Sequence, residues 1–331
     1  MPNTIYDVCG IGNAIVDILV SVDESFIEKH KLFKSTMTMI SEERAEELYA
    51  IMKQSDFTEC SGGSVANTMA GIASLGGMPA YIGKTKQDKP GESFHYDMRR
   101  IGVHFDTPAA PSGKSTARCY IFVTPDAHRT MNTYIGACAE LSADDINDAL
   151  IAHSKVTYIE GYLWDAPSAK DAIRKAFKIA KMKNRKVAFT LSDLFCVERH
   201  RDEFWELVTS SIDILFANEA ELLSLTQKSD WESARAAIRG RCPIAVLTRS
   251  EKGSQIVTKL DTIEIEPGRH LKVIDTTGAG DLYASGFLYG YTQGWDLKRC
   301  GELATRCASE IIQQFGARPS RHLIQLIPLV A

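Results

Sequence analysis

The sequence has few of the features that mark several large classes of protein. Its eight cysteines form no C-x-x-C pair, and its eight histidines show no metal-ligand spacing. No apolar run is long enough to cross a membrane. Basic and acidic residues nearly balance, 38 against 42, so no nucleic-acid-binding surface is indicated. Free cysteines and the lack of a signal-peptide pattern lead us to expect a cytoplasmic protein with no membrane or nucleic-acid partner.

A dinucleotide-binding fingerprint is also missing. Gly10-Ile11-Gly12-Asn13 begins like one, but the third glycine is absent, and residues 16–20 continue as a strand instead of opening a helix. We therefore expect the chain to bend at Gly12 and to form a second strand that carries one inward-facing carboxylate, Asp17. Apolar neighbours on both sides favour a functional role for Asp17 over a solvated one.

From Leu141 onward the sequence contains a regular alternation of strands and helices, which predicts a three-layer α/β/α core with a mainly parallel sheet. The expected strands cover 156–159, 187–191, 212–216 and 244–247, and the expected helices include 142–152, 168–183 and 296–314. Because its 331 residues contain no linker or internal repeat, the chain is expected to form one domain, residues 1–331.

Several strands in the first half do not fit this alternation. Residues 116–124 and 130–135 alternate as a hairpin, and the strands near Asp17 and 37–40 are equally isolated. We expect them to form a small separate β-sheet, a lid over a ligand cleft, built from insertions at roughly 12–40 and 112–137.

The most informative stretch is Asp275-Thr276-Thr277-Gly278-Ala279-Gly280-Asp281, which precedes an apolar helix. Small residues at a helix N-terminus let backbone N–H groups approach an anion such as phosphate closely. Asp281, on the first turn, would point to the same place. An ordinary Gly-rich turn capped by an aspartate is the simpler interpretation of these residues alone, so partners elsewhere in the chain have to decide.

Another group of polar residues is expected at the carboxyl edge of the sheet, where ligands bind in such folds. Gly62 and Gly63 precede a helix for which Ser64 is the predicted N-cap, and Asn67 lies one turn further on. Backbone N–H groups and a carboxamide at this position can supply hydrogen-bond donors and acceptors to a polyol.

Asn218 and Glu221 form a third group at the same expected edge. They lie three residues apart at a helix start, so both side chains face one way. Oxygen ligands of this kind suit Mg²⁺, which usually keeps several of its waters. On these residues alone, a helix cap next to a solvated glutamate is the commoner outcome.

Together these motifs resemble those of the ribokinase-like (PfkB-type) family of sugar and nucleoside kinases. The stretch 275–281 is similar to the carboxy-terminal signature of that family, Gly62-Gly63-Ser64-Val65-Ala66-Asn67 to its amino-terminal signature, and Asn218-Glu219-Ala220-Glu221 to its Asn-x-x-Glu motif. The resemblance covers nearly the whole chain. It implies transfer of the γ-phosphoryl group of ATP to a primary hydroxyl.

The resemblance also implies a role for each matching position. Asp281 becomes the base that accepts the hydroxyl proton, and Gly278, Ala279 and Gly280 form the anion hole for the transferring group. Mg²⁺ is organised by Asn218 and Glu221, directly or through water. The positions implied to hold the hydroxyls of the acceptor are Asn13, Asp17, Gly62, Gly63 and Asn67.

On the nucleotide side, the resemblance implies contacts from Asn218, Thr277 and Thr248. The segment from Arg249 to Gly253 departs from the family pattern, so its contacts with the nucleotide stay open. Thr305 and Ser309 on the last helix are expected near the adenine, with ordinary helix packing as the alternative. A monovalent cation such as K⁺ near the anion loop occurs in relatives.

Within the family the chain most resembles the adenosine-kinase-like branch, through the segments 12–17, 129–137 and 158–162. A nucleoside base needs an apolar or aromatic slot. The residues expected to supply it are Met37, Met39, Met131, Tyr134, Tyr162 and Leu163, with packing inside the lid as the alternative.

The favoured function is therefore phosphorylation of the 5′ hydroxyl of a nucleoside, adenosine above others. A sugar kinase acting on ribose, fructose or a keto-deoxy sugar is the first alternative. A catalytically silent ligand-binding regulator is the second, although intact motifs argue against it. The expected partners are ATP and a small-molecule acceptor, and the chain is expected to be a monomer or a homodimer.

Overall fold

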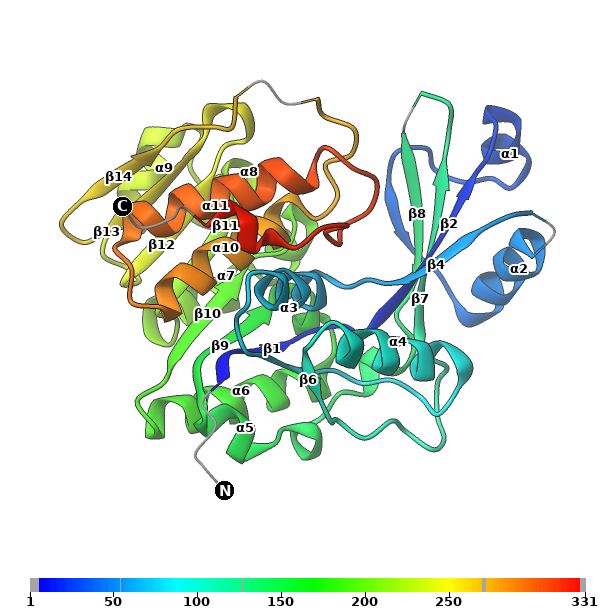
Figure 1. The fold of residues 1–331 in the computed structure, drawn as a ribbon, viewed down its shortest axis with the longest axis horizontal. Coiled ribbons are helices and arrows are strands. Elements are labelled where there is room, and N and C mark those ends of the chain that lie inside the picture. The colour runs from blue at the N-terminus through cyan, green and yellow to red at the C-terminus, as the bar shows by residue number, and fades with distance from the viewer. Residues whose placement is uncertain (1–5, 54, 127, 270–271, 328–331) are drawn as a thin grey trace.

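The computed structural model describes residues 6–53, 55–126, 128–269 and 272–327, which form two β-sheets of nine and five strands (Figure 1). The strand order of the large sheet is β14-β13-β12-β11-β10-β9-β1-β5-β6. Its neighbours pair in parallel from β12 to β6, and only β13 and β14 are antiparallel. Its strands are β1 (Tyr6–Ile11), β5 (Pro79–Ile82), β6 (His104–Phe105), β9 (Ser154–Glu160), β10 (Lys186–Thr190), β11 (Ile214–Asn218), β12 (Ile244–Thr248), β13 (Ser254–Thr258) and β14 (Thr262–Ile265).

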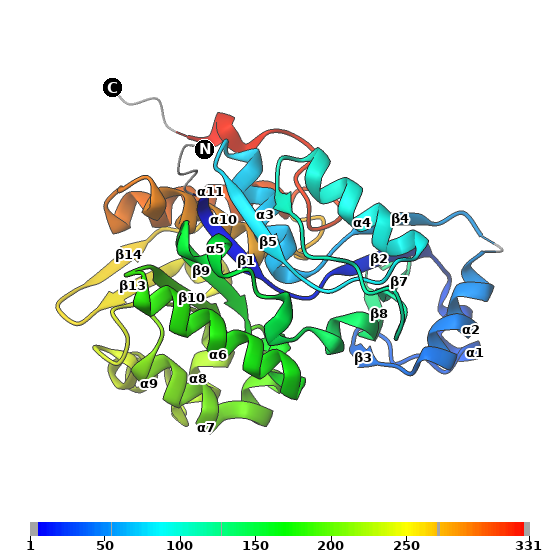
Figure 2. The ribbon, with the colours of Figure 1, turned by 90° about the horizontal axis from the view of Figure 1, so that it is seen from below.

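Helices cover both faces of the large sheet, because its strands are apolar on both sides. In β10, for example, Val187 and Phe189 enter one hydrophobic core and Ala188 enters the other. One face packs against α3 (Ser64–Ser74), α4 (Lys89–Arg100), α10 (Ala279–Thr292) and α11 (Leu297–Ile311). The other packs against α5 (Asp148–Ala152), α6 (Pro167–Met182), α7 (Leu194–Ser210), α8 (Glu219–Thr226) and α9 (Trp231–Ile238) (Figure 2). The expected three-layer α/β/α fold is confirmed.

The five-stranded second sheet lies beside the large one, in the order β3-β8-β7-β2-β4 (Figure 1). Its strands are β2 (Ile15–Ser21), β3 (Met37–Met39), β4 (Thr58–Ser61), β7 (Ala117–Val123) and β8 (Arg129–Tyr134). Burial alternates along β2, where Val16, Ile18 and Val20 pack into the core that also holds side chains of α1 (Glu24–Lys29) and α2 (Glu42–Met52). Asp17 therefore lies on the opposite face.

Some expected elements differ from those observed. The helix expected over 142–152 is a 3-10 turn, Ala143–Asp145, followed by the separate short helix α5. Two side chains interrupt it, because the Asp145 carboxylate accepts the Ser142 backbone N–H at 2.9 Å and the Asn147 side chain caps the new helix. The second sheet also contains β4 and packs with α1, neither of which the sequence pattern indicated.

Two expectations from composition can be compared with the structure. All eight cysteines are free, and every one except the half-buried Cys60 is buried. Among the described residues, no helix is both long and apolar enough to span a membrane.

Candidate active site

The anion loop, residues 275–280, leads directly into α10. Gly278 is the N-cap residue of this helix and has a φ of 78°, which favours glycine. A Cβ atom on Gly278 would also lie 2.7 Å from the Cβ of Ala317, so the close packing there requires glycine for a second reason. A Cβ on Gly280 would meet no atom within 4 Å, so the space in front of the first turn is open. An anion placed there would face the positive end of a helix of 14 residues.

Asp281 lies on the first turn of α10 and is held by two donors from α3. Its carboxylate accepts a hydrogen bond from the Ser64 hydroxyl at 2.7 Å and from the Asn67 amide at 3.0 Å. Burial raises the pKa of Asp281 to about 6, while these two hydrogen bonds act in the opposite direction. The carboxylate is therefore mostly ionised at neutral pH and can accept a proton.

Ser64 was expected to be the N-cap of α3, and this expectation is wrong. The N-cap is Gly63, whose φ of 89° is strained for any residue with a side chain. Ser64 is the first residue of the helix instead. The Ser64 side chain does not accept a backbone N–H of the helix, as an N-cap would, and its hydroxyl donates to Asp281 instead.

Asp17 lies close to the two glycines that the sequence singled out. A Cβ on Gly62 would be 2.2 Å from Oδ2 of Asp17, and a Cβ on Gly63 would be 2.2 Å from the carbonyl oxygen of Asn13. Burial raises the pKa of Asp17 to about 7; Arg318 and Arg129 lower it, and Asp281 raises it further. Asp17 on β2 and Asp281 on α10 are thus near enough for their charges to interact.

Glu160, at the end of β9, is a functional candidate that the sequence reasoning missed. Its buried carboxylate accepts hydrogen bonds from the backbone N–H and the amide of Asn13, at 2.9 and 2.7 Å, and from the Val65 N–H at 3.0 Å. It therefore joins the link between β1 and β2 to the start of α3. Burial raises the pKa of Glu160 to about 7. Its place at the carboxyl end of a parallel strand was the available signal.

Arg129, at the start of β8, connects the second sheet to the anion loop. Its guanidinium forms an ion pair with Asp275 and donates to the Thr277 hydroxyl at 2.7 Å. The side chains are largely buried, with 11% of Arg129 and 4% of Asp275 exposed. The sequence reasoning placed Thr277 near the nucleotide but assigned no role to Arg129. This cation stands directly beside the loop expected to hold a phosphoryl group.

Asn218 and Glu221 form a capping box at the start of α8. The Asn218 side chain accepts from the Glu221 N–H at 2.9 Å, and the Glu221 carboxylate accepts from the backbone N–H and the amide of Asn218 at 2.9 and 2.7 Å. Burial raises the pKa of Glu221 to about 7. No group of three or more His, Cys, Asp or Glu side chains that could hold a metal exists within the described ranges.

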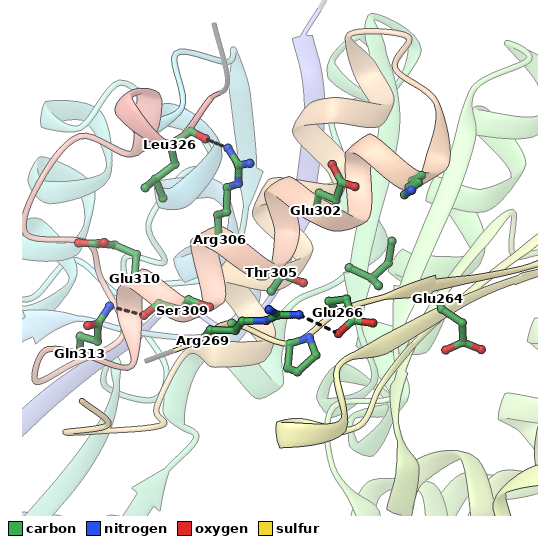
Figure 3. Close-up of a pocket in the computed structure, with 14 residues that line it drawn as sticks. Glu264, Glu266, Arg269, Glu302, Thr305, Arg306, Ser309, Glu310, Gln313 and Leu326 are labelled. Atoms are coloured by element: carbon green, nitrogen blue, oxygen red, sulfur yellow. Dashed lines mark hydrogen bonds and ion pairs between the residues drawn. The ribbon is translucent and has the colours of Figure 1, made fainter. Parts of the chain in front are cut away.

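A cavity of about 640 Å³ lies between α11 and the segment after β14 (Figure 3). Thr305 and Ser309, both expected near the adenine, line it from the α11 side. The C-terminal end of α11 is hydrogen-bonded to the residue that precedes the anion loop, since the N–H of Ile274 donates to the carbonyl of Ile312 at 2.8 Å. The remaining lining residues are Glu264, Ile265, Glu266, Pro267, Gly268, Arg269, Lys298, Glu302, Arg306, Glu310, Gln313 and Leu326.

The other two residues predicted on the nucleotide side, Thr248 and Gly253, lie at the end of β12 and directly before β13. Thr248 ends β12 and is the register partner of Asn218 in β11, so both side chains belong to one edge of the sheet. Gly253 has a φ of 79°, and a Cβ there would lie 2.3 Å from the carbonyl oxygen of Ile265, which also borders the cavity.

The residues expected to form an apolar slot separate into two groups. Met39 is 54% exposed, Met37 is 40% exposed and Met131 is half-buried, all on the second sheet. Tyr134 and Leu163 are only 6% and 2% exposed and belong to the hydrophobic cores. Neither side chain is available to a base, although Leu163 packs in the core of the large sheet and not inside the lid.

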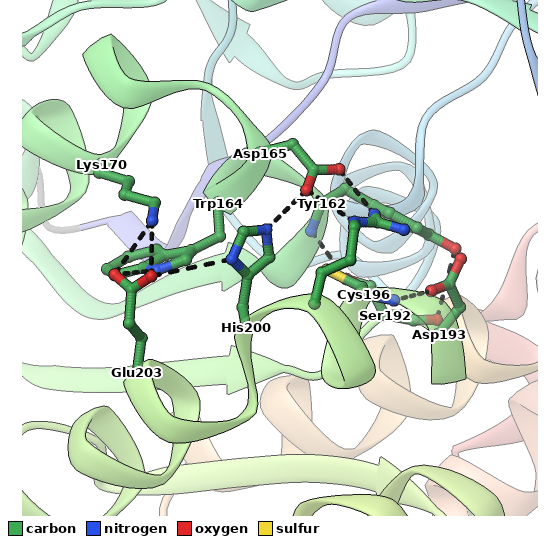
Figure 4. A network of polar contacts seen from close by, with 10 residues as sticks. Tyr162, Trp164, Asp165, Lys170, Ser192, Asp193, Cys196, His200 and Glu203 are labelled. Carbon is green, nitrogen blue, oxygen red and sulfur yellow. Dashed lines mark hydrogen bonds and ion pairs between the residues drawn. The ribbon is translucent and has the colours of Figure 1, made fainter.

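Tyr162 is held by a polar network at the carboxyl edge of the large sheet (Figure 4). It lies in the 3-10 turn Gly161–Asp165, and its hydroxyl donates to the carbonyl of Ser192 at 3.4 Å. The same turn is fixed by Asp165, which accepts from His200 at 2.6 Å. Burial raises the pKa of Tyr162 well above 10, so its hydroxyl stays protonated.

Comparison with known proteins identifies the family. Residues 33–323 match the model of the pfkB family of carbohydrate kinases, and the chain belongs to this family. It is 47% identical to a probable sugar kinase protein from Rhizobium etli CFN 42, with a TM-score of 0.91 and 97% of each chain covered. It is 49% identical to the adenosine kinase from Sinorhizobium meliloti, with a TM-score of 0.90 and coverage of 97% of this chain and 98% of the other.

A curated relative carries a different name. Over 318 residues the chain is 25% identical to a 5-dehydro-2-deoxygluconokinase from Bacillus licheniformis, which covers 93% of this chain and 90% of the relative. The predicted resemblance is confirmed, and the protein is a phosphotransferase of the family that acts on sugar and nucleoside hydroxyls.

Proposed function

We propose that the protein is an ATP- and Mg²⁺-dependent kinase that phosphorylates the 5′ hydroxyl of a nucleoside, with adenosine as the preferred acceptor. The observation that carries this proposal is a pair of neighbouring carboxylates, Asp281 on the first turn of α10 and Asp17 on β2. Asp281 is held by Ser64 and Asn67 in front of the open anion loop, and Asp17 lies near it on the second sheet. An acceptor whose vicinal hydroxyls donate to Asp17 can present a further hydroxyl to Asp281.

In this reaction the residues of the site accept a proton and stabilise negative charge. Asp281 takes the proton of the attacking hydroxyl, and its pKa of about 6 keeps it available as a base at neutral pH. The backbone N–H groups at Gly278 to Gly280 and the α10 dipole stabilise negative charge on the transferring group. ATP with Mg²⁺ supplies the phosphoryl group when bound. Arg129 adds a positive charge beside this loop.

The metal contact is proposed to be indirect. Each side-chain oxygen of Asn218 and Glu221 already accepts one hydrogen bond within the pair. The lone pairs that remain suit waters of a hydrated Mg²⁺ better than direct ligation. The cavity bordered by Thr305 and Ser309 is the proposed adenine site of ATP. A monovalent cation near Asp275 is not part of the proposal, because Arg129 already pairs with that carboxylate.

The preference for a nucleoside rests on the surface around Asp17. The strand register puts Leu19, Ile121, Met131 and Met37 in one row across the second sheet, next to the row that contains Asp17. Ile121 is buried, whereas Leu19, Met131 and Met37 are partly exposed and provide an apolar surface for a flat base. A bare sugar has no group to place there. The adenosine kinase at 49% identity agrees with this preference.

The sugar-kinase alternative is favoured by the names of the Rhizobium etli and Bacillus licheniformis relatives. A panel of acceptors decides between the two. Purified protein with ATP and Mg²⁺ would be assayed with adenosine, other nucleosides, ribose, fructose and 5-dehydro-2-deoxygluconate. We expect the highest kcat/KM with adenosine. A higher value with any free sugar or sugar acid would overturn the nucleoside assignment, and no turnover with any acceptor would favour a silent binding protein.

A further inference from the structure

The segment that follows α11 returns to the acceptor site and is firmly held there. The N–H of Gly316 donates to Asp275 at 2.8 Å, Ala317 packs against Gly278, and the Gln314 amide donates to the carbonyl of Arg318 at 2.6 Å. These contacts join the segment to the anion loop. They fix the backbone from which the Arg318 side chain extends.

The Arg318 guanidinium reaches α3 and α4 beneath the acceptor site. Its Nε donates to Oδ1 of Asn67, and one terminal nitrogen contacts the sulfur of Met98, both at 3.4 Å. The charged or titratable groups that face it are Asp17 on β2, Cys60 on β4, Asp97 on α4 and Tyr81 on β5. No ion pair within 4.0 Å joins Arg318 to any of them in the described part of the chain. Its five N–H groups are therefore far from saturated.

Arg318 and Asp281 together determine which way the Asn67 amide points. A guanidinium can only donate hydrogen bonds, so the Asn67 atom facing it must be the oxygen. An ionised carboxylate can only accept, so the atom facing Asp281 must be the nitrogen. The amide can satisfy both neighbours in one orientation only. Without Arg318, only the contact with Asp281 would hold the Asn67 amide in this orientation.

Among the cations near Asp17, Arg318 lowers the pKa of this carboxyl the most. Arg129 is the second, Asp281 acts in the opposite direction, and the thiols of Cys60 and Cys119 flank Asp17 in the strand register. Asp17 has to be ionised to accept hydrogen bonds from two hydroxyls. A cation that faces it stabilises that form.

We propose that Arg318 is a positioning residue of the acceptor site. It orients the Asn67 amide toward Asp281 and stabilises the ionised Asp17 carboxylate that receives the acceptor hydroxyls. The inference rests on the proposed function, and it concerns a residue from the C-terminal segment that the sequence motifs do not include.

The test is a pH series of steady-state kinetics on wild type, Arg318→Met and Arg318→Lys, with the best acceptor of the panel. Methionine has a similar length but no charge. We expect Arg318→Met to raise the acceptor KM roughly 10- to 100-fold, the effect of a lost hydrogen bond to a charged group. The acid limb of kcat/KM should move to higher pH by about one unit, because loss of the cation raises the pKa of Asp17. The KM for ATP should stay unchanged.

Arg318→Lys restores the positive charge but not the planar set of guanidinium donors. The acid limb of kcat/KM should therefore return to its wild-type pH, while the acceptor KM should stay partly raised. Arg321→Gln, a more exposed arginine of the same segment, is the matched control and should behave like wild type. If Arg318→Met lowers thermal stability and activity at all pH values without moving the acid limb, the role is only structural and the proposal fails. A wild-type enzyme without turnover would overturn the proposed function instead, and the Arg318 role with it.

Discussion

Asp17 gives the sharpest test of the electrostatics of the site. Burial raises its pKa from 3.8 to about 7, so the folded protein holds the proton of this carboxyl more tightly than the unfolded chain does. Its contribution to folding is then fully favourable below pH 4, and stability is lost as pH rises from about 4 to about 7. Asp17→Asn removes the charge and keeps the shape, so it should remove this loss.

The size of the effect follows from the shift. About three pKa units at about 1.4 kcal/mol each set an upper bound of about 4 kcal/mol. Asp17 is only partly buried, so water screens part of this energy. We expect Asp17→Asn to be more stable than wild type by about 1–3 kcal/mol at pH 8 and nearly equal at pH 4. The acceptor KM should rise sharply at the same time, because an amide replaces the carboxylate that receives hydroxyls.

The assay is urea unfolding at pH 4, 6 and 8, together with acceptor kinetics at pH 8. Asp23→Asn is the matched control, since Asp23 is an exposed N-cap with a lowered pKa and asparagine caps equally well. It should leave the stability nearly unchanged at all three pH values. An Asp17→Asn variant that is less stable than wild type at pH 8 would refute the reasoning. So would a variant whose free energy of unfolding differs from that of wild type by the same amount at pH 4 and at pH 8.

Three other predictions concern single contacts. Gly62→Ala places a Cβ 2.2 Å from the Asp17 carboxylate and should raise the acceptor KM at least about tenfold with the ATP KM unchanged; equal changes in both constants would contradict it. Thr305→Trp should fill the cavity beside α11 and raise the KM for ATP alone, as measured by initial rates; an effect on the acceptor KM would place the nucleotide elsewhere. Glu221→Gln keeps a capping partner for Asn218, so circular dichroism should show an intact fold while the Mg²⁺ concentration for half-maximal rate rises; an unchanged Mg²⁺ requirement would reduce the pair to a helix cap.

Local signals allowed much of the fold to be predicted. The three-layer core followed from the alternation of strands and helices after Leu141, and the anion loop from small residues before an apolar helix. The strand β4 was not predicted, because Thr58–Ser61 is short and mostly polar, its first two residues are exposed, and it pairs only with β2 at the edge of the sheet. Patterns of burial cannot indicate a strand whose side chains are not buried.

The site could be predicted only where its residues belong to compact motifs. Asp281, Asn67 and Asp17 stood out by local context, and the structure brings them together. Arg129 and Arg318 carry no local signal, since their contacts are made with Thr277 and Asn67, 148 and 251 residues away. Such contacts depend on how the second sheet and the C-terminal segment pack, which no short stretch of sequence encodes.

The central claim is that Asp281 is the base for phosphoryl transfer to the 5′ hydroxyl of adenosine. The most direct measurement is the single-turnover rate of 5′-AMP formation from adenosine, ATP and Mg²⁺ by wild type and Asp281→Asn, followed by mass spectrometry across pH 5–9. With adenosine saturating at every pH, so that the ionisation of Asp17 does not limit binding, we expect 5′-AMP as the product and an acid limb near pH 6 in the wild type. The rate of the variant should be about 10²- to 10⁴-fold lower and should lack that limb. A variant that keeps a near-normal rate, or a wild type that makes no 5′-AMP, would contradict the claim.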